Sequence, residues 1–146
     1  MRTKRKEMMA ILVLVGVMLL QSVNVFAANQ DQHVYAESNG PRRFVGIMTH
    51  YYSFKLLSNG QLSISTSINP QPGYAVGINI ELQKNAGGNS WSTINTWSVE
   101  KNGYVSLVVE PYVVRGTYRL KITFTAKNSN GVIVDSDVVY SNSITY

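Results

Sequence analysis

The chain has 146 residues, 13 lysines and arginines against 8 aspartates and glutamates, a formal net charge of +5, and no cysteine. Its length is that of a single domain, and the lack of cysteine excludes disulfides, thiol nucleophiles, iron–sulfur clusters and zinc sites of the cysteine type. After residue 27 the chain carries nine basic and seven acidic residues, a balance that does not indicate a nucleic-acid partner, since that requires clustered basic side chains.

Residues 1–27 have the pattern of a secretory signal peptide. Four basic residues lie within the first six positions, an apolar run extends from Ala10 to Leu20, and Val25-Phe26-Ala27 follows. A basic head, a short apolar stretch and small residues at the cleavage point are features of such leaders. The apolar run is shorter than the roughly 20 residues that cross a bilayer, so a retained membrane anchor is the weaker alternative. We expect cleavage after Ala27 or Ala28, and a secreted, extracellular product that is not attached to a membrane.

Residues 28–43 are polar and without periodicity, and they are expected to form a flexible lead-in. From residue 44 onward, short runs of alternating apolar and polar residues are separated by turn residues, which is typical of an all-β sandwich or barrel. Seven strands are predicted, with no amphipathic helix, at 44–57, 62–68, 76–83, 91–100, 104–109, 118–125 and 132–146. The first strand is irregular and predicts a bulge near 49–52, and the three-residue spacing of apolar residues within 91–100 predicts another.

Two stretches resemble bacterial immunoglobulin-like modules. Residues 80–84, a glycine turn and Trp91-Ser92-Thr93-Ile94 are similar to their central hairpin, and residues 116–122 are similar to their sixth strand. The resemblance implies a single immunoglobulin-like or fibronectin-III-like antiparallel β-sandwich of about seven strands over residues 44–146. It also implies a tyrosine corner, in which the hydroxyl of Tyr118 bonds to nearby backbone.

The chain from residue 44 is also similar to small secreted proteins of Gram-positive bacteria whose function is not known. The similarity lies in Phe44-Val45-Gly46-Ile47, in Ser58-Asn59-Gly60 and in Ser129-Asn130-Gly131-Val132. These motifs are turns and core positions. The similarity therefore implies fold and export, and it implies no activity.

Catalysis requires titratable groups that converge, and this chain offers few. His33 lies in the lead-in, and His50 is interpreted as a surface or rim histidine of the first strand. Asp135 and Asp137 are the one tight acidic pair, and they are interpreted as like charges on an edge strand that prevent edge-to-edge pairing. A weak calcium site is the alternative, although the glycine and the distal glutamate of an EF-hand loop are missing. We therefore predict no enzyme activity, no catalytic residue, no metal and no cofactor.

Nine tyrosines and two tryptophans are a heavy aromatic load for a chain of this length. Exposed aromatic rings provide large contact areas for sugars and proteins at a small cost in entropy. The candidate ligand-binding residues are Trp91, Trp97, Tyr104 and Tyr112. The alternative is that the two tryptophans cover the edge of the core and their cross-strand neighbours.

The sequence thus predicts a secreted, non-enzymatic binding or interaction module whose partner is an extracellular glycan or protein. One alternative is a structural or self-assembling extracellular protein, suggested by serine- and threonine-rich strand faces and a possible open sheet edge. A secreted toxin or bacteriocin-like protein is a third hypothesis. Arg119 and Lys121 are expected on a solvated strand face, with contact to an anionic polymer as the alternative. The oligomeric state is left open.

Overall fold

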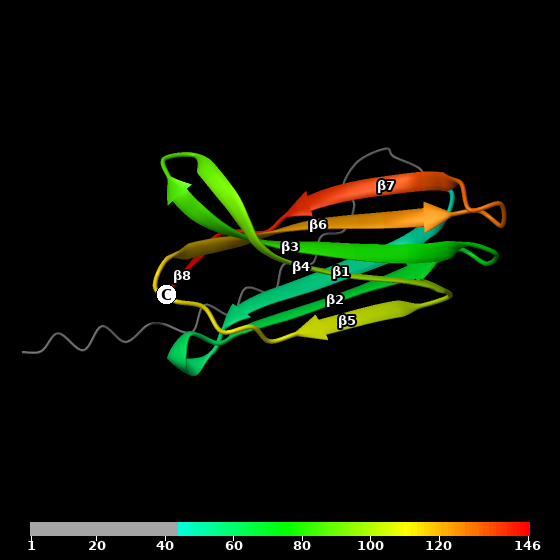
Figure 1. The fold of residues 1–146 in the computed structure, drawn as a ribbon. Coiled ribbons are helices and arrows are strands. Elements are labelled where there is room, and N and C mark those ends of the chain that lie inside the picture. Colours follow the sequence, from blue (N-terminus) through cyan, green and yellow to red (C-terminus); the bar gives the residue numbers. More distant parts are fainter. Residues whose placement is uncertain (1–43) are drawn as a thin grey trace, which may run out of the picture.

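A computed structural model describes residues 44–146 of the chain (Figure 1). In this part of the chain the regular elements are strands and one short 3-10 turn, η1 (Ser58–Gly60). The strands are β1 (Ile47–Leu56), β2 (Leu62–Pro70), β3 (Ala75–Gly87), β4 (Ser90–Asn102), β5 (Val105–Val109), β6 (Thr117–Lys127), β7 (Ile133–Tyr140) and β8 (Ile144–Thr145). The predicted signal peptide and lead-in lie outside the described residues.

The strands form two antiparallel sheets that pack face to face (Figure 1). One sheet has the order β1-β2-β5, and the other has the order β4-β3-β6-β7, with β8 paired to β6. The chain crosses between the sheets after β2, after β4 and after β5, and hairpins join β1 to β2, β3 to β4 and β6 to β7, whereas β8 pairs with β6 and not with β7. The predicted all-β sandwich is therefore confirmed, with β3 and β6 at the centre of the larger sheet. The predicted last strand divides into β7 and β8.

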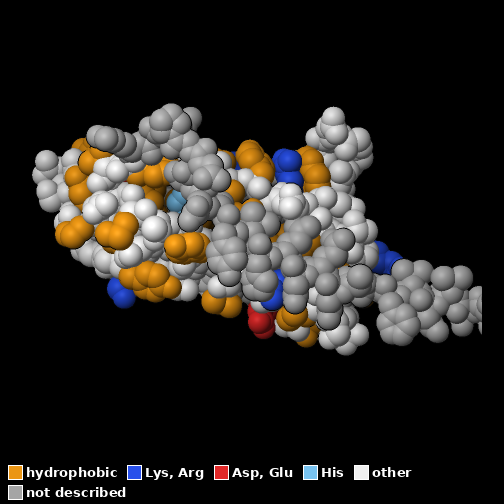
Figure 2. Space-filling view, turned by 180° about the vertical axis from the view of Figure 1, so that it is seen from behind, with side chains coloured by type: hydrophobic (Ala, Val, Ile, Leu, Met, Phe, Trp, Pro, Cys, Tyr) orange, Lys and Arg blue, Asp and Glu red, His pale blue; other side chains and the backbone are white. Residues whose placement is uncertain are grey.

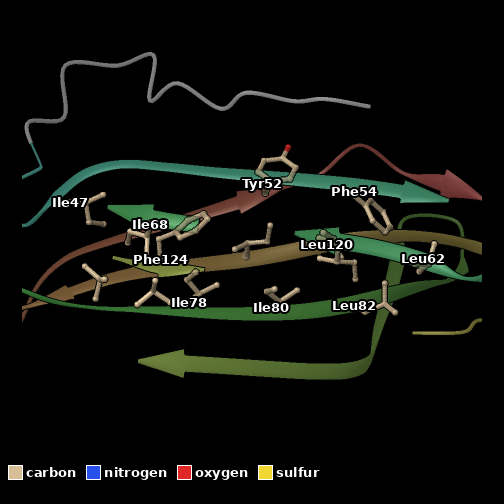
Figure 3. Close-up of a cluster of buried hydrophobic side chains, with 14 of the residues drawn as sticks. Ile47, Tyr52, Phe54, Leu62, Ile68, Ile78, Ile80, Leu82, Leu120 and Phe124 are labelled. Carbon is tan, nitrogen blue, oxygen red and sulfur yellow. The ribbon is translucent and has the colours of Figure 1, made fainter. Parts of the chain in front are cut away.

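The core between the sheets is filled by alternate residues of the central strands β2, β3 and β6 (Figure 3). Their side chains at these positions are at most 2% exposed, and they are Leu62, Ile64, Ile68, Val76, Ile78, Ile80, Leu82, Leu120, Ile122 and Phe124. The polar residues between them face outward, because successive side chains of a strand point to opposite faces of the sheet. The period-two pattern of the sequence is thus confirmed in all three strands.

The bulge predicted in residues 91–100 is present, and it decides where the tryptophans point. In β1 the register shifts at Met48, just before the predicted segment 49–52, which pairs regularly with β2. In β4 the register with β3 shifts around Ile94, and one extra residue reverses the face on which the following side chains lie. Trp97 is therefore opposite Ile80 and faces the core, whereas Trp91 lies on the outer face of the larger sheet.

The tyrosine corner implied by the resemblance is confirmed. Tyr118 is 1% exposed, and its hydroxyl donates a hydrogen bond to the backbone carbonyl of Val114, with an O–O distance of 2.6 Å. This bond fastens the β5–β6 connection to the core. Close by, the backbone of Gly116 exchanges two hydrogen bonds with that of Tyr146, which fixes the C-terminal residue beside the same connection.

At the edge where β1 approaches β7, the two sheets are joined by side chains. Asp135 and Asp137 lie on one face of the edge strand β7, as predicted, but this face is turned toward β1. Oδ2 of Asp135 accepts hydrogen bonds from the backbone N–H groups of Gly46 (2.5 Å) and Ile47 (3.1 Å). Oδ2 of Asp137 lies 3.3 Å from Nε2 of His50. The two carboxylates therefore bind the neighbouring sheet.

The interpretation of His50 as a surface histidine is wrong. His50 is only 5% exposed, and its ring packs against Phe124, with a distance of 4.3 Å between ring centroids. Burial lowers the pKa of His50 below its usual value, and the nearby carboxylate of Asp137 opposes this shift only in part. The ring is therefore neutral at pH 7, with Nε2 directed at the carboxylate of Asp137.

Acid should weaken the fold through His50. Its pKa is lower in the folded chain than in the unfolded chain, so the unfolded chain binds the proton more tightly, and stability falls as the pH drops below about 6.5. Urea unfolding at pH 7.5, 6.5 and 5.5 should show this loss, and a His50→Gln variant should show a flatter pH dependence. An equal pH dependence of stability in the two proteins would contradict the assignment, because the variant lacks the His50 imidazole.

Candidate functional site

The four aromatic residues proposed from the sequence do not come together in the fold. Tyr104 is 60% exposed and lies beside the β4–β5 turn, whereas Tyr112 is 73% exposed and bridges to Gln61 at the opposite end of the sandwich. Trp97 is half-buried against the core, which is the alternative role considered for it, and Trp91 lies on the outer face of the larger sheet. A shared ligand site of all four is therefore not possible.

Tyr104 borders a large hollow at the end of the sandwich where three turns meet. The hollow has a volume of about 790 Å³ and lies between the β2–β3, β4–β5 and β6–β7 connections. Each connection contains a glycine with positive φ, at +88° for Gly73, +84° for Gly103 and +77° for Gly131. Such residues allow the tight turns that hold the walls in place. Seen from behind in Figure 2, hydrophobic side chains gather toward this end of the molecule, which lies at left.

A second hollow, of about 630 Å³, adjoins the first on the outer face of the smaller sheet. It is lined by Thr49, Tyr51, Ser67, Asn69 and Tyr104, and it shares the last two residues with the hollow at the turns. Ser67 of β2 lies in this lining because its neighbour Ile68 points into the core. Tyr104 thus borders both hollows, which together we call the Tyr104 cleft.

The lining of the Tyr104 cleft combines apolar surface with neutral polar groups. The apolar part comes from Met48, Pro70, Pro72 and the rings of Tyr74 and Tyr104, and the polar part from asparagines and serines of the turns. The one carboxylate among its described lining residues belongs to Glu100, whose oxygens accept hydrogen bonds from Nζ of Lys127 at 2.7 and 2.8 Å. Such a surface suits binding, because aromatic rings supply contact area and amides and hydroxyls fix orientation.

A different cluster occupies the outer face of the larger sheet. Cζ of Arg119 lies 4.3 Å from the ring centroid of Trp91 and 4.7 Å from that of Tyr140, and its Nε donates to Oε1 of Gln83 at 2.8 Å. Arg119 therefore lies on the outer, solvent-facing side of the sheet, as expected, and it is flanked there by two aromatic rings that the expectation did not include. We call Trp91, Arg119, Tyr140 and Gln83 the Arg119 cluster.

Lys121, the other basic residue expected on this face, forms an ion pair with Glu81. Nζ of Lys121 lies 2.7 Å from Oε1 of Glu81, and the hydroxyl of Thr93 donates to Oε2 at 2.9 Å. The hydrogen bond from Lys121 lowers the pKa of Glu81, and the same bond raises the pKa of Lys121. The carboxylate of Glu81 is thus ionised at pH 7, and the positive charge of Lys121 balances its negative charge.

The sequence could place Arg119 and Lys121 on one face of their strand but not find their partners. The alternation of β6 gives the shared face directly. The partners of Arg119 come from β3, β4 and β7, so strand order and register had to be known. The bulge at Ile94, which turns Trp91 outward, is a second condition that the alternation alone does not reveal.

Comparison of the chain with models of protein families, with curated proteins and with solved structures finds no match. What is confirmed of the resemblance is therefore the architecture, a two-sheet antiparallel β-sandwich. Within residues 44–146, no three histidine, cysteine or acidic side chains are placed so that they could hold a metal ion. The same residues include no helix of the length and hydrophobicity that crossing a membrane requires.

Proposed function

We propose that the protein is a secreted, non-enzymatic binding module that binds an extracellular glycan through the Tyr104 cleft. The observation that supports this most is the position of Tyr104, whose exposed ring borders both hollows. A sugar ring can pack its C–H face on a tyrosine ring while its hydroxyl groups bond to neighbouring amides and hydroxyls. Asn69, Asn102 and Ser67 line the cleft beside the ring and carry such groups.

Secretion is part of the proposal and rests on the sequence. The basic head and the short apolar run of residues 1–27 support export followed by cleavage. We also propose, from the motifs of residues 44–47, 58–60 and 129–132, that the chain belongs with the small secreted proteins of Gram-positive bacteria that it resembles. N-terminal sequencing of the exported protein tests the leader directly, with Ala28 or Asn29 as the expected first residue.

Replacing Tyr104 with alanine should abolish most of the glycan binding. The ring is exposed in the free protein, so its removal leaves the core intact, but the ligand loses its main contact surface. A glycan array should first identify a bound sugar, and calorimetry on that sugar should then show at least tenfold weaker binding, which is about 1.4 kcal/mol.

Tyr112→Ala is the matched control for this experiment. Tyr112 is as exposed as Tyr104 but lies at the opposite end of the sandwich, so its removal should leave affinity and stability unchanged. If the Tyr104→Ala variant binds the glycan as tightly as the wild-type protein does, the binding site lies elsewhere. If no glycan binds on the array, and a purified protein binds in a way that depends on Tyr104, then the ligand of the cleft is a protein and not a glycan.

A second candidate function is self-assembly through the edge of the larger sheet. The edge strand β7 exposes Ile133, Val134 and Val138, and an unpaired apolar edge strand can add to the sheet of another copy. Light scattering over a hundredfold range of protein concentration tests this. Growth of the mass with concentration would support assembly, and a constant monomer mass would exclude it.

A further inference from the structure

We propose that the Arg119 cluster is a second binding site, which takes an oxyanion, a carboxylate or a phosphate, carried by an extracellular ligand. The guanidinium of Arg119 is held on three sides by groups from three other strands, two rings and one amide. Such enclosure fixes the orientation of a side chain that is otherwise among the most mobile. A fixed guanidinium loses little conformational entropy when it binds a ligand.

The terminal nitrogens of Arg119 remain open for a ligand. In the described part of the chain, its one side-chain hydrogen bond is made by Nε, to Gln83. No buried side-chain nitrogen or oxygen of residues 44–146 lacks a hydrogen-bond partner, so both Nη atoms must reach the solvent. The two Nη atoms form one edge of the planar guanidinium, and this edge can donate two parallel hydrogen bonds to an oxyanion.

The surroundings do not neutralise this positive charge. The nearest acidic side chain on the same face, Glu81, is held by Lys121 and Thr93. The other cross-strand neighbour of Glu81 is Thr96, and those of Asn79 are Ser98 and Thr123, so these three neighbours carry hydroxyl groups and no charge. The rings of Trp91 and Tyr140 flank the charge and provide apolar surface for the carbon atoms of a ligand. The geometry therefore suits an anionic group on a larger organic molecule.

Fluorescence can test the site because the chain has two tryptophans. A Trp97→Phe variant leaves Trp91, whose ring lies on the guanidinium, as the single reporter. The probes are oligogalacturonate for carboxylate, glycerol phosphate for phosphate, and neutral galactose, titrated at constant ionic strength. We expect a saturable change in Trp91 emission with at least one anion and none with galactose, and the two anions distinguish the sources of the charge.

Two variants separate a specific site from general attraction. Arg119→Lys keeps the positive charge but loses the paired donors, and its affinity for the anion should be at least tenfold lower. Lys101→Gln removes an exposed charge at the far end of β4 and should leave the affinity within twofold. If Arg119→Lys does not fold, the NMR signal of the Arg119 side-chain Nε–H is followed in the wild-type protein. It should shift saturably as the anion is added, and the absence of a shift would contradict the site.

Three results would contradict an anion site at Arg119. The absence of a saturable response to either anion, an equal response to galactose, or equal anion affinity of a folded Arg119→Lys variant would each overturn it. These results are independent of the Tyr104 cleft, because Tyr104 lies at the β4–β5 turn and Arg119 lies near the other end of the larger sheet. A variant that loses only glycan binding and one that loses only anion binding would identify the two sites separately.

Discussion

Replacing Asp135 with alanine should lower the free energy of unfolding by about 3 kcal/mol. The variant loses two hydrogen bonds to one charged oxygen, and the N–H groups of Gly46 and Ile47 lose their partner at a half-buried position. Hydrogen bonds to a charged group contribute about 1.5–3 kcal/mol each, and unpaired buried donors add a penalty. Urea unfolding followed by tryptophan fluorescence measures the loss, and the melting temperature should fall by roughly 10–20 °C.

Two further variants isolate the cause. Asp135→Asn keeps an acceptor oxygen but not the charge, so it should lose about half as much stability. Glu110→Ala removes an exposed carboxylate and should change stability by less than about 0.5 kcal/mol. A loss below 1 kcal/mol in Asp135→Ala would mean that this carboxylate does not hold β1 against β7.

Replacing Gly60 with alanine should be similarly damaging, at about 3–4 kcal/mol. Gly60 has a φ of +75°, where a side chain is strained, and a Cβ atom there would lie 2.6 Å from a ring carbon of Tyr146 and 2.7 Å from the carbonyl oxygen of Val113. The ring can turn aside, but the carbonyl is backbone and moves only with its loop. Thermal and urea unfolding should both report the loss.

Gly103→Ala is the matched control for this effect. Its φ of +84° is nearly the same, but a Cβ atom there would meet nothing within 4 Å. The control should therefore lose only the cost of the backbone conformation, about 1–2 kcal/mol. The difference between the two variants measures the close contact with Tyr146 and Val113, and equal losses would show that this contact is unimportant.

Period-two alternation predicted the strands because their burial is simple. In β2, β3 and β6 one face meets the core and the other meets solvent, so the order of apolar and polar residues maps directly onto the fold. The alternation did not predict the burial and contacts of His50, Asp135 and Asp137. Acidic and histidine side chains are mostly exposed, and only the approach of β1 to β7 supplies the partners that make their burial favourable.

The candidate site was harder to predict than the fold because it depends on which strand ends meet. Tyr104 was among the residues chosen from the sequence, but its neighbours in the cleft belong to three connections that are distant along the chain. Tyr112 looked equivalent from composition and lies at the other end. Arg119 looked like an ordinary solvated residue, because a cation between two rings from different strands leaves no local pattern.

The fixing of Tyr146 beside Gly116 has a practical consequence for measurements on a surface. Tyr146 lies at the opposite end of the sandwich from Tyr104, as the position of the C-terminus in Figure 1 shows. Immobilisation through a peptide tag fused after Tyr146 would therefore orient every molecule with the three turns directed into the flowing solution. Coupling through random lysines would attach part of the sample by Lys127, next to Glu100, and block the very hollow to be assayed.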